Sequence, residues 1–242
     1  MTNLEELSMN AVPALQTLLF DGWVIRMSDG YTKRANSVNP VYDSTEDLDR
    51  KIRYCESLFL GNDLRPTYKI TPFTSPVNLD AILAQKGYRT MDATSVQTRS
   101  LADLPEPAIR TVELETAFSP VWLAQYCEFN RVGFESRQTY ARMLKSLIPQ
   151  ALYATLFHDG EPVGVGLAVL ENGYMGLFDV TIAEARRDCG FGRQLMLNLM
   201  HAGHARGADH AYLQVVMGNG PALRLYESLG FREAYRYHYR VQ

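Results

Sequence analysis

Two glycines one residue apart, Gly190 and Gly192, lie in a polar loop between an apolar run and a helical pattern. Residues 174–182 are mostly apolar, and residues 190–206 carry apolar side chains at helical spacing, which predicts a strand leading into a helix. Because the loop offers no capping hydroxyl, the first N–H groups of that helix are left unpaired beside the positive end of its dipole. Glycine also lets the backbone approach a ligand closely. This stretch therefore predicts an anion-binding loop.

Two arginines, Arg187 and Arg193, flank the glycines and add positive charge. Each charge-assisted hydrogen bond of this kind is worth about 1.5–3 kcal/mol, so four or five of them can hold a diphosphate. Two glycines at a turn are by themselves a weak signal, since many strand-to-helix turns use glycine. The loop becomes informative through the residues that follow it.

A second motif follows the loop after a strand-like run at 210–217. Residues 187–192 read R-x-x-G-x-G, and residues 219–231 read N-x-x-A-x-x-x-Y-x-x-x-G-F. Their order, with the strand between them, resembles the GNAT superfamily of acyl-CoA-dependent N-acyltransferases over roughly the last 130 residues. The resemblance implies an α/β (α+β) fold with a mixed central sheet flanked by helices. It also implies an acyltransferase whose donor substrate is acetyl-CoA, with no metal.

The resemblance further implies which residues bind the coenzyme A moiety. They are the end of the central strand, the loop, the helix start and the second motif: Val180, Thr181, Ile182, Arg187, Asp188, Cys189, Gly190, Phe191, Gly192, Arg193, Asn219, Ala222 and Tyr226. The chain departs from the family pattern at Asp188 and Cys189, where glycine and a basic residue are commoner. An acid beside a diphosphate is unfavourable, so we expect Asp188 to face solvent or to pair with Arg186, and affinity to be moderate. We expect Cys189 to fill the loop rather than to react.

The nucleophile of an N-acyltransferase is a free amine. Removing a proton from a lysine-like ammonium at neutral pH costs about 4.6 kcal/mol, so a base or a water chain must accept that proton. Asp179, on the central strand, is the candidate base, with Glu135 in reserve. The alternative for Asp179 is a carboxylate that faces solvent or anchors a loop.

The leaving thiolate needs a proton. Tyr226 has the family's general-acid position, and a phenol normally stays protonated at pH 7. The alternative is a packing tyrosine. Asn219 is implied to bind the pantetheine arm, although Asn-Gly is also an ordinary turn. The backbone from Val180 to Ile182 can donate to the thioester carbonyl if the central strand separates from its neighbour there.

Composition excludes several classes of protein. The 242 residues are 46% hydrophobic and 21% charged, which is ordinary for a folded protein. A net charge of −3 gives no long-range attraction to nucleic acid or to an anionic membrane. The sequence shows neither a signal peptide nor an apolar run of membrane-spanning length, so we expect a cytoplasmic protein with three reduced cysteines. His201 and His204 lack a third ligand for a metal. The expected partner is a small-molecule amine acceptor, and the expected state is a monomer or homodimer.

Local signals divide the chain into two predicted domains. The proline-containing stretch 100–107 marks the boundary, which gives a smaller, degenerate GNAT-like domain at 1–104 and a catalytic domain at 105–242. The catalytic half reads β-α-α-β-β-β-α-β-α-β, with Ser119 and Pro120 starting its first helix and a last strand at 235–241. In the first half, we expect a helical segment over 4–19 interrupted by Pro13, a hairpin of strands 23–27 and 31–38, a helix starting at Ser44, a strand at 68–73, a helix over 79–86 and a strand or bent hairpin over 88–99.

The two halves resemble each other locally. When Gly87 is aligned with Gly230, two predicted short helices fall on each other in the alignment. Each ends at a glycine followed by an aromatic residue, and an extended run comes after it. This predicts a tandem duplication in which the N-terminal copy has lost its chemistry, because it lacks the glycine loop and has Leu83 where the other half has Tyr226. Chance similarity is the alternative, since such units are common.

Two other functions fit part of the pattern. One is a catalytically idle acyl-CoA-binding or sensor protein. The other is a dinucleotide oxidoreductase, which is disfavoured because Leu195 stands where the third glycine of G-x-G-x-x-G belongs and because the glycines lie far from the first strand.

Overall fold

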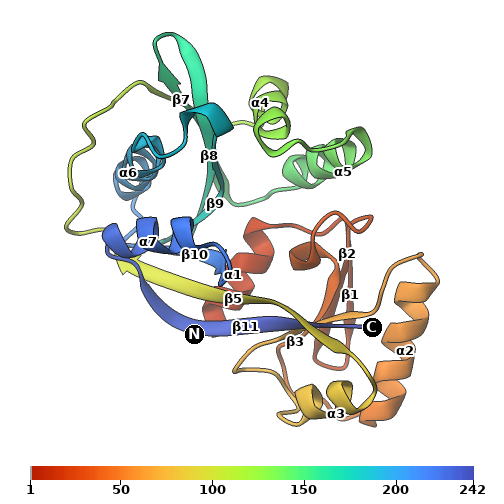
Figure 1. Cartoon of the computed structure of the whole chain (residues 1–242). Helices are drawn as coiled ribbons and strands as arrows, with labels where there is room; N and C mark the ends of the chain where they lie inside the picture. Colours follow the sequence, from red (N-terminus) through yellow and green to blue (C-terminus); the bar gives the residue numbers. More distant parts are fainter. Residues whose placement is uncertain (1) are drawn as a thin grey trace. The chain divides into compact units, whose positions relative to one another are not determined.

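The computed structural model describes residues 2–242, with side chains from residue 4 onward. Its internal contacts divide the described chain into two compact units, residues 96–234 and residues 2–95 together with 235–242 (Figure 1). The boundary at 104/105 stays a prediction about domains, and the predicted first domain begins one residue outside the described chain. The compact units divide nine residues earlier, and the C-terminal segment belongs to the first of them.

The first unit contains a mixed sheet with strand order β1-β2-β3-β4-β11. Strands β1–β3 pair antiparallel, β3 and β4 are parallel, and β11 pairs antiparallel with β4, where Val241 faces Thr67. The elements are α1 (Thr2–Ala11), β1 (Gln16–Phe20), β2 (Trp23–Met27), η1 (Lys33–Ala35), β3 (Ser37–Pro40), α2 (Leu48–Leu60), β4 (Thr67–Ile70), α3 (Leu79–Gln85), and most of β5 (Arg89–Ser100) and β11 (Arg232–Val241).

Several predicted elements of this unit are wrong in detail. The helical segment over 4–19 ends at Ala11, before Pro13, and residues 16–20 form a strand that pairs with β2 across the turn at Asp21 and Gly22. The predicted strand over 31–38 is a 3-10 turn followed by the shorter β3. The second helix is capped by Asp47, whose side chain accepts from the N–H of Arg50, rather than by Ser44. The strand predicted at 68–73 is β4, which ends at Ile70.

A buried ion pair ties α1 to the sheet of the first unit. Lys69 Nζ lies 2.6 Å from the Glu5 carboxylate, and these side chains are 5% and 2% exposed. The Tyr235 hydroxyl donates to Glu5 over 2.5 Å, and the Lys69 ammonium lies 4.1 Å from the centre of the Tyr237 ring. The C-terminal strand therefore contributes to the interior of the N-terminal unit.

The second unit contains the sheet that positions the glycine loop. Strands β6 to β9 pair antiparallel in chain order, and β10 pairs parallel with β9. The elements are β6 (Val112–Glu115), α4 (Pro120–Asn130), α5 (Phe134–Lys145), β7 (Gln150–His158), β8 (Glu161–Glu171), β9 (Tyr174–Ile182), η2 (Glu184–Arg186), α6 (Phe191–His204), β10 (His210–Val216) and α7 (Gly220–Ser228). With β11 they confirm the predicted order β-α-α-β-β-β-α-β-α-β.

Local chemistry accounts for the ends of these elements. The Ser119 side chain accepts from the N–H of Trp122 at 3.1 Å, and Pro120 occupies the first turn of α4, as the sequence predicts. Helix α6 buries Leu195 and Leu199 against the sheet in the core of this unit. None of the helices in the described part of the chain is long and apolar enough to cross a membrane.

The predicted resemblance between the halves is visible in their local geometry. Gly87 and Gly230 both take left-handed conformations, with φ of 87° and 84°. In each case the aromatic residue that follows donates its N–H five residues back, Tyr88 to the Leu83 carbonyl and Phe231 to the Tyr226 carbonyl, both at 3.0 Å. The same stop therefore ends α3 and α7, although a common origin of the halves stays a prediction.

Candidate active site

The glycine loop forms the uncapped start of helix α6. Gly190 is the N-cap residue, with φ of 79°, and no side chain caps the helix. A Cβ built at Gly190 meets nothing within 4 Å, so the space in front of the helix start is open. The first N–H groups of the helix therefore face outward with the positive end of the dipole behind them, as the sequence predicts.

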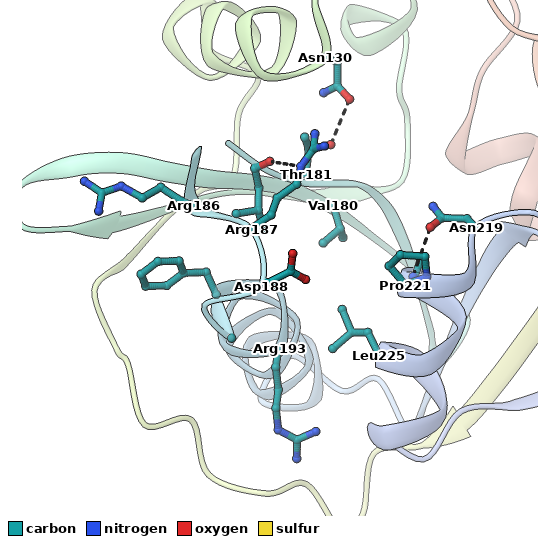
Figure 2. A pocket seen from close by; sticks show the side chains of 15 residues that line it. Asn130, Val180, Thr181, Arg186, Arg187, Asp188, Arg193, Asn219, Pro221 and Leu225 are labelled. Atoms are coloured by element: carbon teal, nitrogen blue, oxygen red, sulfur yellow. Dashed lines mark hydrogen bonds between the residues drawn. The ribbon is translucent and has the colours of Figure 1, made fainter. Parts of the chain in front are cut away.

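A cavity of about 550 Å³ lies against this helix start (Figure 2). Most of the predicted coenzyme-binding residues line it. The lining consists of Asn130, Val180, Thr181, Ile182, Arg186, Arg187, Asp188, Gly190, Phe191, Gly192, Arg193, Asn219, Pro221, Ala222 and Leu225. The fold thus brings together the end of β9, the loop and the first turns of α7. The first and last of these lining residues, Val180 and Leu225, are 45 positions apart in the sequence.

Strand β9 separates from β10 beside the cavity. Their parallel register runs from Tyr174 with His210 to Leu177 with Leu213, and both strands continue past this point. The end of β9 from Val180 to Ile182 lines the cavity instead. This is the separation that would allow its backbone to bind a linear amide-containing group, such as the pantetheine arm of coenzyme A.

Asp179 lies at an irregularity just before this strand end. Its φ of 54° is left-handed, and its carboxylate accepts a hydrogen bond from the Tyr140 hydroxyl of α5. The side chain is partly buried, one residue before the cavity wall. Asp179 is therefore held by a specific partner, and its role as a base stays a prediction. Glu135, the reserve, lies in the first turn of α5.

Tyr226 packs in α7 next to the cavity-lining Leu225. Its ring is edge-on to Phe231 with centroids 6.0 Å apart, and it is partly buried against the core of the unit. Burial raises the pKa of its phenol above the ordinary value. A neutral phenol can act as a proton donor. In this part of α7, however, the side chain that lines the cavity is Leu225. The role of Tyr226 as an acid stays a prediction.

Two asparagines shape the walls of the cavity. Asn219 accepts from the N–H of Ala222 at 3.2 Å, so its side-chain oxygen caps α7, and the ordinary turn function is present alongside any ligand contact (Figure 2). Asn130, at the end of α4, accepts from the Thr181 hydroxyl at 3.2 Å. Sequence reasoning missed Asn130, because only the fold brings α4 to the end of β9. It also missed Pro221 and Leu225, which lie at variable positions of the second motif and line the cavity from α7.

The charged side chains of the loop do not all point at the cavity. Arg193 donates to Ser228 on α7, and Arg187 Nε donates to the Ile182 carbonyl at 3.3 Å. Figure 2 shows Arg186 extending away from Asp188, whose exposed carboxylate lines the cavity. Cys189 is exposed, and its thiol donates to the Arg187 carbonyl at 3.4 Å. An acid thus lines the cavity where an anion is predicted to bind, and the moderate affinity stays a prediction.

The residues present fit the diphosphate and pantetheine of an acyl-CoA. The uncapped N–H groups and nearby arginines suit a diphosphate, and the exposed end of β9 suits an amide-containing arm. The acetyl end would then lie at the β9 irregularity, where Asp179 is placed.

A family model matches this chain over residues 1–240, and its description is "Probable histone acetyltransferase Rv0428c C-terminal". A protein of Bacillus subtilis (strain 168), described as uncharacterized N-acetyltransferase YobR, is 28% identical over 246 residues, which cover 99% of this chain and 97% of that protein.

Solved structures share the fold over the whole chain. A GCN5-related N-acetyltransferase from Kribbella flavida is 14% identical with a TM-score of 0.72, covering 100% of this chain and 95% of the other. A tandem GNAT protein from the clavulanic acid biosynthesis pathway is 18% identical with a TM-score of 0.67, covering 99% of this chain and 87% of the other. At these identities the likeness shows the fold alone, which is the one the two motifs imply.

Proposed function

The chain belongs to the family described as probable histone acetyltransferase Rv0428c C-terminal, within the GNAT superfamily of acyltransferases, and from that premise we propose its reaction. The protein transfers the acetyl group of acetyl-CoA to the primary amine of a small-molecule or amino-acid-like acceptor by direct attack. The observation that carries the proposal is the uncapped, glycine-lined start of α6, which opens onto a cavity beside the separated end of β9.

The chain's own residues have separate tasks in this reaction. The loop from Arg187 to Gly192 binds the diphosphate, and the end of β9 orients the arm so that the thioester lies near Asp179. The acceptor ammonium gives one proton to Asp179, and the freed nitrogen lone pair bonds to the acetyl carbon. The carbon–sulfur bond breaks, the sulfur keeps the electron pair, and the phenol of Tyr226 protonates it. The second nitrogen proton leaves to solvent, and solvent returns one proton to Tyr226. Asp179 then gives its proton to solvent, so that one proton is released for each acetyl group transferred.

Ligand binding tests the first half of this proposal. Calorimetry with acetyl-CoA, coenzyme A and NAD should give binding for the first two, at micromolar Kd, and none for NAD. Binding of NAD in place of acetyl-CoA would favour the oxidoreductase reading of the glycine loop.

Thiol release tests the second half. Free coenzyme A is followed with a chromogenic disulfide during incubation with diamines, amino acids, amino sugars and a lysine-containing histone-tail peptide. The proposal expects turnover with a small amine. Release of coenzyme A with the peptide alone would mean that the acceptor is a lysine of a protein rather than a small amine, in line with the family's description. Tight binding of acetyl-CoA without release by any amine would favour the idle acyl-CoA-binding alternative.

A further inference from the structure

Strand β9 contains an extra residue at Asp179. Val165 of β8 pairs with Thr181, while Leu167 pairs with Phe178, so Asp179 and Val180 together lie opposite Gly166. This is a β-bulge, a feature that turns a side chain away from the regular alternation of a strand. The left-handed φ of 54° at Asp179 costs about 1 kcal/mol for a residue with a Cβ. Such an irregularity persists only where surrounding contacts fix it.

Tyr140 is one of those contacts. It comes from α5, is 5% exposed, and donates its hydroxyl to Asp179 Oδ2. Its ring lies 5.0 Å from Tyr126 of α4, which stacks on Trp122 with centroids 5.6 Å apart. The Trp122 indole donates to the Ala154 carbonyl of β7 at 3.1 Å. The Tyr140 hydroxyl is therefore aimed by a packed row of aromatic rings rather than by a mobile side chain.

Two other titratable groups near this cluster are neutral, whereas Arg137 of α5 carries a positive charge that acts on Cys127. Burial, and then the charge of Asp179, raises the pKa of Tyr153 on β7 to about 12. Burial also raises the pKa of Cys127 on α4. The segment of β8 opposite the bulge contributes only Val165, Gly166 and Leu167. The described surroundings therefore supply Asp179 with a hydrogen-bond donor from Tyr140, which favours the ionised carboxylate.

We propose that Tyr140 is a positioning residue, which holds the Asp179 carboxylate ionised and turned toward the acceptor so that it seats a cationic primary amine. This inference rests on the proposed function and adds Tyr140 as the residue that places the carboxylate for the acceptor ammonium. The attraction between carboxylate and ammonium brings the nitrogen to the bulge, where Asp179 takes the proton that the nitrogen must lose.

The test replaces Tyr140 by phenylalanine, which keeps the ring and removes only the hydroxyl. The acidic limb of kcat/KM for the acceptor should move up by about one pH unit, since the bond that stabilises the charged carboxylate is lost. Because the carboxylate also loses the contact that orients it, KM for the acceptor should rise about tenfold at pH 7, while the Kd for acetyl-CoA stays unchanged. Tyr174→Phe, at the other end of β9, is the matched control and should leave both values as in the unsubstituted protein.

A second readout does not depend on turnover. The titration of the Asp179 carboxyl carbon, followed by NMR in protein labelled at aspartate and assigned with Asp179→Asn, should also move up by about one unit in Tyr140→Phe. An unchanged titration, or an unchanged acidic limb, would overturn the role of Tyr140. If no amine supports release of coenzyme A, the proposed function fails, and the carboxyl titration still decides separately whether Tyr140 sets the charge of Asp179.

Discussion

Gly192 and Leu225 bring the first turn of α6 and the middle of α7 into close approach. A Cβ built at Gly192 would lie 3.3 Å from Leu225 Cδ2 and 3.8 Å from Ile182 Cγ1. The two sequence motifs therefore form adjoining walls of one cavity, and any side chain at the helix start reduces the room for a ligand. The consequences differ between Gly192, which is crowded, and Gly190, which faces open space.

Substitutions at Gly190 separate charge from backbone strain. Gly190→Glu places a carboxylate at the uncapped helix start, so we expect the affinity for acetyl-CoA to fall by at least a hundredfold. Gly190→Asn is the matched control, because asparagine tolerates the left-handed φ of 79° and carries no charge, and it should lose no more than about tenfold. Calorimetry with acetyl-CoA measures both. Equal losses in the two variants would mean that the site does not select an anion.

Asp188 offers a gain of function. Its carboxylate lines the cavity next to the expected diphosphate, so Asp188→Asn should tighten acetyl-CoA binding by about three- to tenfold at low salt. Asparagine also suits the left-handed φ of 60° at this position. The gain should shrink as ionic strength rises, since the repulsion is screened. An affinity that does not change with this substitution would place the diphosphate elsewhere in the cavity.

The sequence predicts the catalytic half well because its signals are local. Ser119 and Pro120 specify the start of α4, and the absence of a cap at Gly190 is itself visible in the loop. The first half is predicted less well. The sequence predicts that residues 16–20 are helical, but they form strand β1 because they pair with β2. Exposed residues such as Leu19 gave no strand signal in the apolar pattern.

The residues of the candidate site likewise divide into those with a local sequence signal and those placed only by the fold. The motif residues on the loop and α7 follow from the family resemblance that the two motifs carry, whereas Asn130 and Tyr140 reach the site only through the packing of α4 and α5 on β9. The extra residue in β9 likewise follows from its register with β8. Long-range pairing of this kind leaves no periodic trace in a single sequence.

Tyr226→Phe tests the proton donor. The substitution keeps the ring packed on Phe231, so acetyl-CoA affinity should be unchanged while kcat falls by about a hundredfold. Because burial raises the pKa of this phenol, it is protonated below that raised pKa, and its contribution is lost only as the pH rises through it. In the unsubstituted protein the alkaline limb that reports Tyr226 should therefore lie above pH 10.

Steady-state rates across pH check this expectation, with Tyr174→Phe as a control for the loss of a tyrosine hydroxyl elsewhere in the same unit. Unchanged kcat in Tyr226→Phe would assign the tyrosine to packing, and the thiolate would then take its proton from solvent.

Breaking the buried pair of Glu5 and Lys69 should destabilise the N-terminal unit strongly. Lys69→Met leaves the Glu5 carboxylate, which is 2% exposed, without its cation, so we expect the free energy of unfolding to fall by about 3–5 kcal/mol. Lys33→Met is the control, because the Lys33 and Asp92 side chains are 35% and 41% exposed and losing their ion pair should cost less than about 1 kcal/mol. Urea denaturation followed by tryptophan fluorescence measures both, since Trp23 lies in the core of this unit. Adding Glu5→Gln to Lys69→Met should restore part of the loss, because the amide still accepts from Tyr235 and no carboxylate remains buried without Lys69. A further loss would instead show that the carboxylate is stabilised by other contacts, such as the charge of the buried Arg26 guanidinium.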